Sequence, residues 1–103
     1  MYNLGLSEEV LDSMIAVFMR NPKITAATVF GSRAKGNLKP FSDVDIAVHG
    51  ECDVLDVEDT AQHLDELPVV FTFDVVAYES IKSSDLKNHI DRVGVVIYNK
   101  ADT

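Results

Sequence analysis

The stretch that decides the fold of this chain is VFGSRAKGNLKPFSDVDIAV, residues 29–48. The small pair Gly31-Ser32 ends one apolar run, and a second apolar run opens with Asp43 and Asp45. Two interpretations are open at this point. The stretch is either an ordinary turn between two strands or a phosphate-binding loop beside a metal site.

Length and composition limit the number of domains and the kinds of binding partner. The chain has 103 residues, which predicts a single domain over residues 1–103, and 47% of them are hydrophobic, enough for a packed core. The net charge of -8 disfavours stable nucleic acid binding and an anionic membrane surface. With the single Cys52 and no long apolar run, we expect a cytoplasmic protein that does not enter a membrane. Because so small a domain buries little surface, a homo-oligomer or hetero-oligomer is plausible.

The hydrophobic periodicity predicts an α+β domain. Helices are expected at 7–20, 53–66 and 83–90, and strands at 24–30, 43–48, 69–78 and 94–98. The helix at 53–66 should face the core with Val54, Leu55, Ala61 and Leu64. The order of elements predicts a mixed sheet of about four strands, with the last strand at an edge and the helices packed on one side.

Asp43 and Asp45 occupy positions i and i+2 of an expected strand, so their side chains point to the same face. Two such carboxylates repel each other unless a cation lies between them. Ligands made only of oxygen suit Mg²⁺ or Mn²⁺ and not zinc. The alternative is that both acids are simply hydrated at the end of a strand.

Asp74 favours the metal interpretation. It lies within FTFDVVAY, residues 71–78, where a lone carboxylate among apolar residues is costly to bury unless it is paired or binds a metal. If this strand is the neighbour of the strand at 43–48, Asp74 reaches the same place as Asp43 and Asp45. Three acids on adjacent strands would hold two Mg²⁺ ions, an arrangement used for in-line displacement at phosphorus.

The glycine-serine turn supplies the second half of such a site. Gly31 permits a positive φ or a close approach by a phosphate, and Ser32 adds a hydroxyl donor. The segment is not a P-loop, because Asn37 and Leu38 follow Gly36 where that motif has Lys and Ser or Thr.

Positive charge is concentrated around this turn. Residues 20–39 contain basic residues and no acidic one, although the chain as a whole is acidic. Arg33 and Lys35 are candidates to steady a polyphosphate, and the alternative is that they are solvated loop charges. His49, which follows the strand at 43–48, is expected to have a structural or surface role.

The segments GSRAKG, SDVDIAV and FDVV resemble the motifs of the polymerase-β-like nucleotidyltransferases. The short length narrows the resemblance to the minimal nucleotidyltransferase (MNT) domains, and it extends from the first helix to the strand GVVIY. The resemblance implies that Ser32 and the adjoining backbone hold the triphosphate of ATP. It also implies that Asp43 and Asp45 bind Mg²⁺ and that Asp74 is a further ligand or the base.

The minimal group is similar to antitoxins paired with HEPN toxins. Such antitoxins act by transferring AMP from ATP onto a toxin tyrosine, by direct binding, or by both. The resemblance therefore implies a HEPN-type toxin as the protein acceptor here. The alternatives are a non-catalytic antitoxin and an ATP-sensing regulatory subunit. The acidic run from Glu51 to Glu66 is either a solvated helix face or a contact surface for a basic partner.

Overall fold

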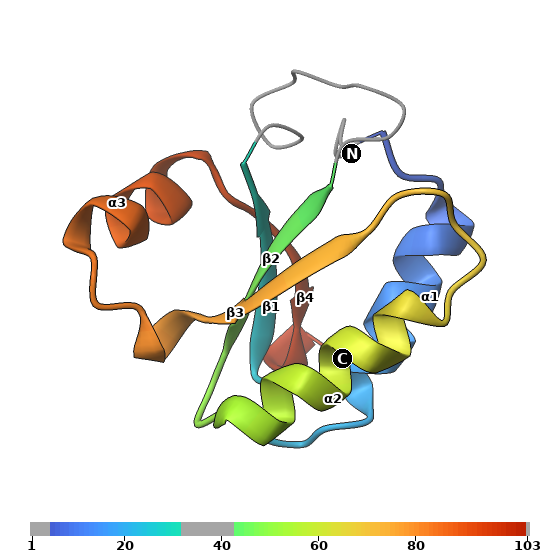
Figure 1. Cartoon of the computed structure of the whole chain (residues 1–103), viewed down its shortest axis with the longest axis horizontal. Coiled ribbons are helices and arrows are strands. Elements are labelled where there is room, and N and C mark those ends of the chain that lie inside the picture. The colour runs from blue at the N-terminus through green and yellow to red at the C-terminus, as the bar shows by residue number, and fades with distance from the viewer. Residues whose placement is uncertain (1–4, 32–42, 103) are drawn as a thin grey trace.

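A computed structural model of the chain describes residues 5–31 and 43–102, and its elements alternate between helix and strand (Figure 1). These elements are α1 (Glu8–Met19), β1 (Ala26–Phe30), β2 (Val44–His49), α2 (Val54–Asp65), β3 (Phe73–Ala77), η1 (Tyr78–Ser80), α3 (Ser84–Val93), β4 (Val95–Asn99) and η2 (Lys100–Asp102). The α+β class predicted from the sequence is confirmed. In this described part, no helix has the length and apolarity needed to cross a membrane.

The four strands form one mixed sheet in the order β3-β2-β1-β4. β1 pairs antiparallel with both β2 and β4, whereas β2 and β3 run parallel. The predicted edge position of the last strand is confirmed, and β3 occupies the opposite edge. A parallel neighbour for β2 is the feature on which the site depends, because it brings residues about 29 positions apart into register.

The main core lies between one face of the sheet and the helices α1 and α2. Val29 and Ile46 from the sheet and Met14, Phe18 and Leu64 from the helices are fully buried in it. Burial of each such side chain contributes roughly 1.5–3 kcal/mol, so this face accounts for most of the stability of the fold. The opposite face is left for polar side chains.

The start of α2 is fixed by a capping box. Asp53 accepts a hydrogen bond from the backbone N–H of Asp56, and the side chain of Asp56 accepts one from the N–H of Asp53. Asp56 also accepts hydrogen bonds from the side chains of Asn21 (2.9 Å) and Lys23 (3.1 Å), which follow α1. These hydrogen bonds, with the one from the Asp53 backbone first, hold the pKa of Asp56 well below its usual range. The result is a polar tie between α1 and α2.

Two details differ from the sequence predictions. Val54 and Leu55 do not face the core: they are 70% and 73% exposed, because they lie in the first turn of α2 and Thr60 and Leu64 make the buried side. The strand expected at 69–78 begins only at Phe73, and Val70 before it is exposed.

The helices are also not all on one side. α1 and α2 share the core face, but α3 packs over β1 next to Thr28 and Phe30, whose side chains alternate with those of the core residues. Figure 1 shows α3 set well apart from the other two helices. The second face of the sheet is thus covered only in part.

Candidate active site on the second face of the sheet

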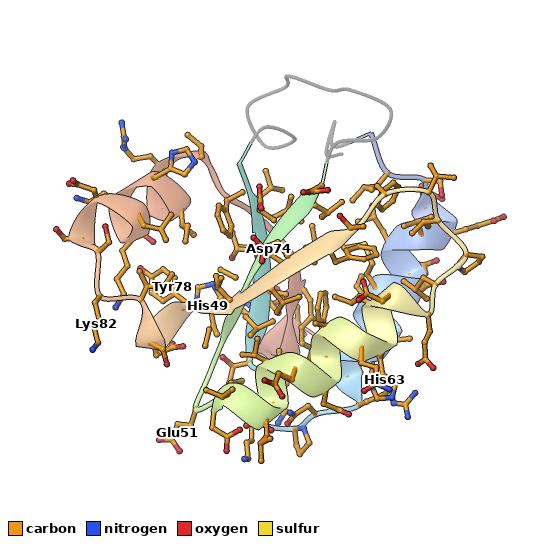
Figure 2. All side chains as sticks on the ribbon, viewed as in Figure 1. His49, Glu51, His63, Asp74, Tyr78 and Lys82 are labelled. Atoms are coloured by element: carbon orange, nitrogen blue, oxygen red, sulfur yellow. The ribbon has the colours of Figure 1, made fainter. Side chains whose placement is uncertain are left out.

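Asp45 and Asp74 lie directly opposite each other. Asp45 on β2 is the register partner of Asp74 on β3 in the parallel pair. Register partners in neighbouring strands point to the same face from backbones about 4.8 Å apart. The condition set by the sequence, that these two strands be neighbours, is therefore met. Figure 2 shows Asp74 on β3.

Asp43 stands just before β2 and is held by a residue that sequence analysis missed. The hydroxyl of Thr72 donates a hydrogen bond to Oδ1 of Asp43, and the N–H of Val44 donates to the carbonyl of Thr72 at 2.9 Å. Thr72 thereby ties the start of β2 to the chain just before β3. The sequence signal that could have identified Thr72 is its position two residues before Asp74, because side chains two residues apart in an extended chain point to the same face.

Gly31 turns the chain directly against Asp45. Its φ is +79°, in the left-handed region, and its neighbour Phe30 is the register partner of Asp45. A Cβ atom at position 31 would collide with the carboxylate of Asp45. Glycine is thus required twice, by the backbone conformation and by the close approach. The other predicted loop residues, Ser32, Arg33 and Lys35, lie outside the described residues.

The carboxylates impose an electrostatic cost on the fold. Asp45 is half-buried, and its pKa is raised first by burial and then by the charges of Asp74 and Asp43. Asp74 is exposed. The energetic cost of burying a carboxylate, which the sequence predicts for Asp74, therefore applies to Asp45 instead. Across residues 5–31 and 43–102, no lysine or arginine forms an ion pair with any of the three. A cation at this place would relieve the repulsion.

The donor set fits a hard divalent cation. It consists of carboxylate oxygens on two rigid strands, the chemistry that Mg²⁺ prefers. As oriented, no three acidic, histidine or cysteine side chains of the described segments converge on one point where a metal would sit. Asp43 accepts the hydrogen bond from Thr72 through Oδ1. The pair that fits a shared cation is Asp45 with Asp74, and Asp43 would join it through Oδ2.

A second polar cluster lies further along the same two strands. His49 Nε2 lies 2.9 Å from the Thr28 hydroxyl, and the His49 ring stacks on Tyr78 with 4.5 Å between centroids. The Tyr78 hydroxyl donates to Asp91 at 2.8 Å, and Lys87 Nζ lies 5.0 Å from the centre of the Tyr78 ring. Burial lowers the pKa of His49. These contacts fasten α3 to the sheet, so His49 has the structural role expected for it.

Comparison with known proteins agrees with this fold. Residues 12–103 match the model of the family described as "Polymerase beta, Nucleotidyltransferase". The chain therefore belongs to this family and carries a nucleotidyltransferase domain. A search among curated proteins gave no match.

Several solved structures with the same fold are similar to this chain. A toxin-antitoxin structure with AMP-PNP is 26% identical with a TM-score of 0.73, over 86% of this chain and 73% of that chain. A mutant of the toxin-antitoxin MntA-HpeT is 27% identical with a TM-score of 0.72, over 91% and 73%. A tri-AMPylated Shewanella oneidensis HEPN toxin in complex with MNT antitoxin is 20% identical with a TM-score of 0.65, over 94% and 76%, and shows the fold alone.

Proposed function

We propose that this chain is a Mg²⁺-dependent nucleotidyltransferase that transfers AMP from ATP to a partner protein, as the antitoxin of a HEPN-type toxin. One observation carries the proposal. Asp45 and Asp74 face each other on parallel strands at the point where Gly31 turns against Asp45. A pair of uncompensated carboxylates beside a glycine turn is the combination that a metal-bound triphosphate requires.

Each residue has a defined part in this proposal. Two Mg²⁺ ions would neutralise phosphate charge and align the reacting groups when bound. Asp43, Asp45 and Asp74 would hold them, while Gly31 and Ser32 offer backbone N–H groups and a hydroxyl to the phosphates. Arg33 and Lys35 would balance the remaining charge of the triphosphate.

The chemical step is an in-line displacement. The acceptor hydroxyl oxygen forms a bond to the α-phosphorus of ATP as the bond from that phosphorus to the bridging oxygen breaks. Pyrophosphate leaves with the electron pair, and Asp74, which is exposed on the edge strand β3, accepts the hydroxyl proton. Positioning and charge stabilisation supply most of the acceleration in such reactions.

A protein acceptor is supported by the similar structures. They include a toxin-antitoxin with AMP-PNP and an AMPylated HEPN toxin bound to its MNT antitoxin. The acidity of this chain, with a net charge of -8, makes a nucleic acid acceptor a poor fit. A basic protein partner in the cytoplasm would be complementary to the negative net charge of this chain.

The test is transfer of label from α-labelled ATP to a purified HEPN-type toxin, with Mg²⁺ present. Substituting Asp43→Asn together with Asp45→Asn should reduce transfer by at least about a hundredfold, the scale for loss of a main charge-stabilising group. Asp65→Asn, an exposed aspartate on α2, is the matched control and should leave transfer unchanged. Normal transfer by the double variant would refute the site. Neutralisation of the toxin without any transfer by the unmodified chain would favour a binding antitoxin instead.

A further inference from the structure

A groove lies at the junction of α2 with the end of β3. It has a volume of about 410 Å³ and is lined by Asp53, Val54, Val57, Glu58, Val76, Ala77 and Ser80. Within residues 5–31 and 43–102, β3 pairs with β2 alone, so its other edge is open beside the groove. In Figure 1 the open edge of β3 crosses in front of β2, above the first turns of α2.

An exposed aliphatic side chain lines this groove. Val54 is 70% exposed, and Leu55, the next residue in the chain but not a lining residue, is 73% exposed. Their sequence pattern is that of core residues, but no side chain in the described segments covers them. Adjacent exposed aliphatic residues next to a concave surface are typical of a protein interaction site.

The charges around the groove determine which partner fits it. Asp53 and Glu58 line it, Glu51 and Glu79 are exposed nearby in the chain, and no basic side chain is among the lining residues. Nucleic acid and anionic lipid are repelled by such a rim, and a second copy of this chain would bring the same acids together. The complementary occupant is a protein surface that presents aliphatic side chains flanked by lysine or arginine.

The groove is next to the candidate active site. Val76, which lines the groove, follows Asp74 by two residues on β3 and lies roughly 7 Å from it at the backbone. α2 packs on the core face and Asp74 points to the second face, so the open edge of β3 lies between them. A segment that is bound in the groove and passes over this edge would reach Asp74.

We propose that this groove is the docking surface for the acceptor, where a basic and aliphatic segment of the toxin binds and brings its hydroxyl group to Asp74. This inference rests on the proposed function and adds to it the surface and the chemistry of the partner. The aliphatic contacts of Val54 and Val57 supply affinity, and Glu58 supplies selection for a basic partner.

The experiment measures affinity and transfer with a purified HEPN-type toxin. Val54→Glu adds an acid to the first turn of α2, where the helix dipole tolerates it, and Glu58→Lys reverses one charge of the rim. The matched controls are Met19→Glu, at an exposed residue that ends α1, and Glu66→Lys, an exposed residue at the other end of α2. Mg²⁺·ATP binding by each variant is measured separately by calorimetry.

We expect Val54→Glu and Glu58→Lys each to raise the Kd for the toxin and the KM for transfer at least tenfold. Both controls and all four Mg²⁺·ATP affinities should stay within twofold of the unmodified chain. A complex that forms equally well with Val54→Glu and Glu58→Lys would overturn the docking surface and leave the nucleotidyltransferase intact. Absence of any complex or transfer with the unmodified chain, in the presence of normal Mg²⁺·ATP binding, would overturn both the docking surface and the choice of partner. Loss of Mg²⁺·ATP binding in the two groove variants would also overturn it, since their effect would then be on the nucleotide site.

Discussion

The pair Asp45–Asp74 lies on β2 and β3, and the pair His49–Tyr78 lies four residues further along the chain, on β2 and at the start of η1 directly after β3. His49 and Tyr78 have partners from this chain: Thr28 for the imidazole, Asp91 for the phenol and each other's rings. Asp45 and Asp74 have only each other and Asp43, all of the same charge, within the described segments. Figure 2 shows Asp74 on β3, with His49 and Tyr78 further along the strands.

The difference shows how to separate structural from functional polar residues in a domain this small. A cluster that satisfies its own hydrogen bonds needs nothing more and acts as a fastening. A cluster of like charges that remains uncompensated weakens the fold until something positive binds. By this criterion the start of β2 and β3 is the site and the far end is the support for α3.

The largest expected effect comes from Gly31→Ala. A methyl group at φ +79° is strained and collides with Asp45, so we expect a loss of about 2–3 kcal/mol in the free energy of unfolding by urea. Gly5→Ala, at φ 69° on an exposed residue, is the comparison at a similar backbone conformation and should cost about 1 kcal/mol. Combining Gly31→Ala with Asp45→Ala should recover part of the loss. Strict additivity of the two would show that the collision is not the cause.

The next effect concerns the hydroxyl that holds Asp43. Thr72→Val keeps the shape of the side chain but removes the donor to Asp43. Loss of a residue that orients a metal ligand typically costs about tenfold or more in metal affinity, so the Mg²⁺ concentration for half-maximal transfer should rise by about that factor. Thr72→Ser should restore it. Equal behaviour of the valine and serine variants would show that the hydroxyl has no such role.

A smaller effect is expected in the pH dependence of stability. The pKa of Asp45 is raised in the folded state, so folding favours its protonated form. This contribution is fully present at low pH, below the pKa of the unfolded chain, and is lost as pH rises through the folded pKa. Without divalent cations, Asp45→Asn should therefore increase stability at neutral pH, by roughly a few tenths of a kcal/mol since the group is partly solvated. A decrease in the Tm of this variant would contradict the electrostatic account.

The smallest effect on nucleotide binding is expected at the support cluster. His49→Phe keeps the stacking on Tyr78 and removes the contact to Thr28, at a cost of about 1 kcal/mol in stability. Affinity for Mg²⁺·ATP, measured by calorimetry, should stay within twofold. A tenfold loss of affinity at an unchanged Tm would place His49 in the nucleotide site and remove the distinction between the two clusters.

Much of this arrangement can be predicted from the sequence, for physical reasons. The alternation in DVDIAV fixes which side chains of β2 face away from the core, and Gly31 at the end of an apolar run indicates a turn with unusual φ. The α+β class and the edge position of β4 follow from the order of the elements. What periodicity cannot supply is the pairing of strands, so the register of Asp45 with Asp74 had to come from the structure.

The misjudged residues have a common cause. Val54 and Leu55 fit a helical apolar pattern, yet α2 begins there and its first turn extends past the core. Asp74 fits a buried strand, but β3 is an edge strand with one open face. Thr72 was missed because a hydroxyl just before a strand has no pattern of its own. The exposure or role of each of these residues depends on where a helix or strand ends relative to the rest of the fold, and the local sequence does not encode this.

The central claim is that Asp45 and Asp74 share a divalent cation, and paramagnetic relaxation by Mn²⁺ tests it most directly. Amide signals of the 103-residue chain are recorded by NMR with increasing Mn²⁺, with and without a non-hydrolysable ATP analogue. The account predicts that residues around Asp45 and Asp74 broaden first, and that Asp45→Asn with Asp74→Asn abolishes this selectivity. Preferential broadening along the acidic helix α2, with residues 45 and 74 unaffected, would contradict it.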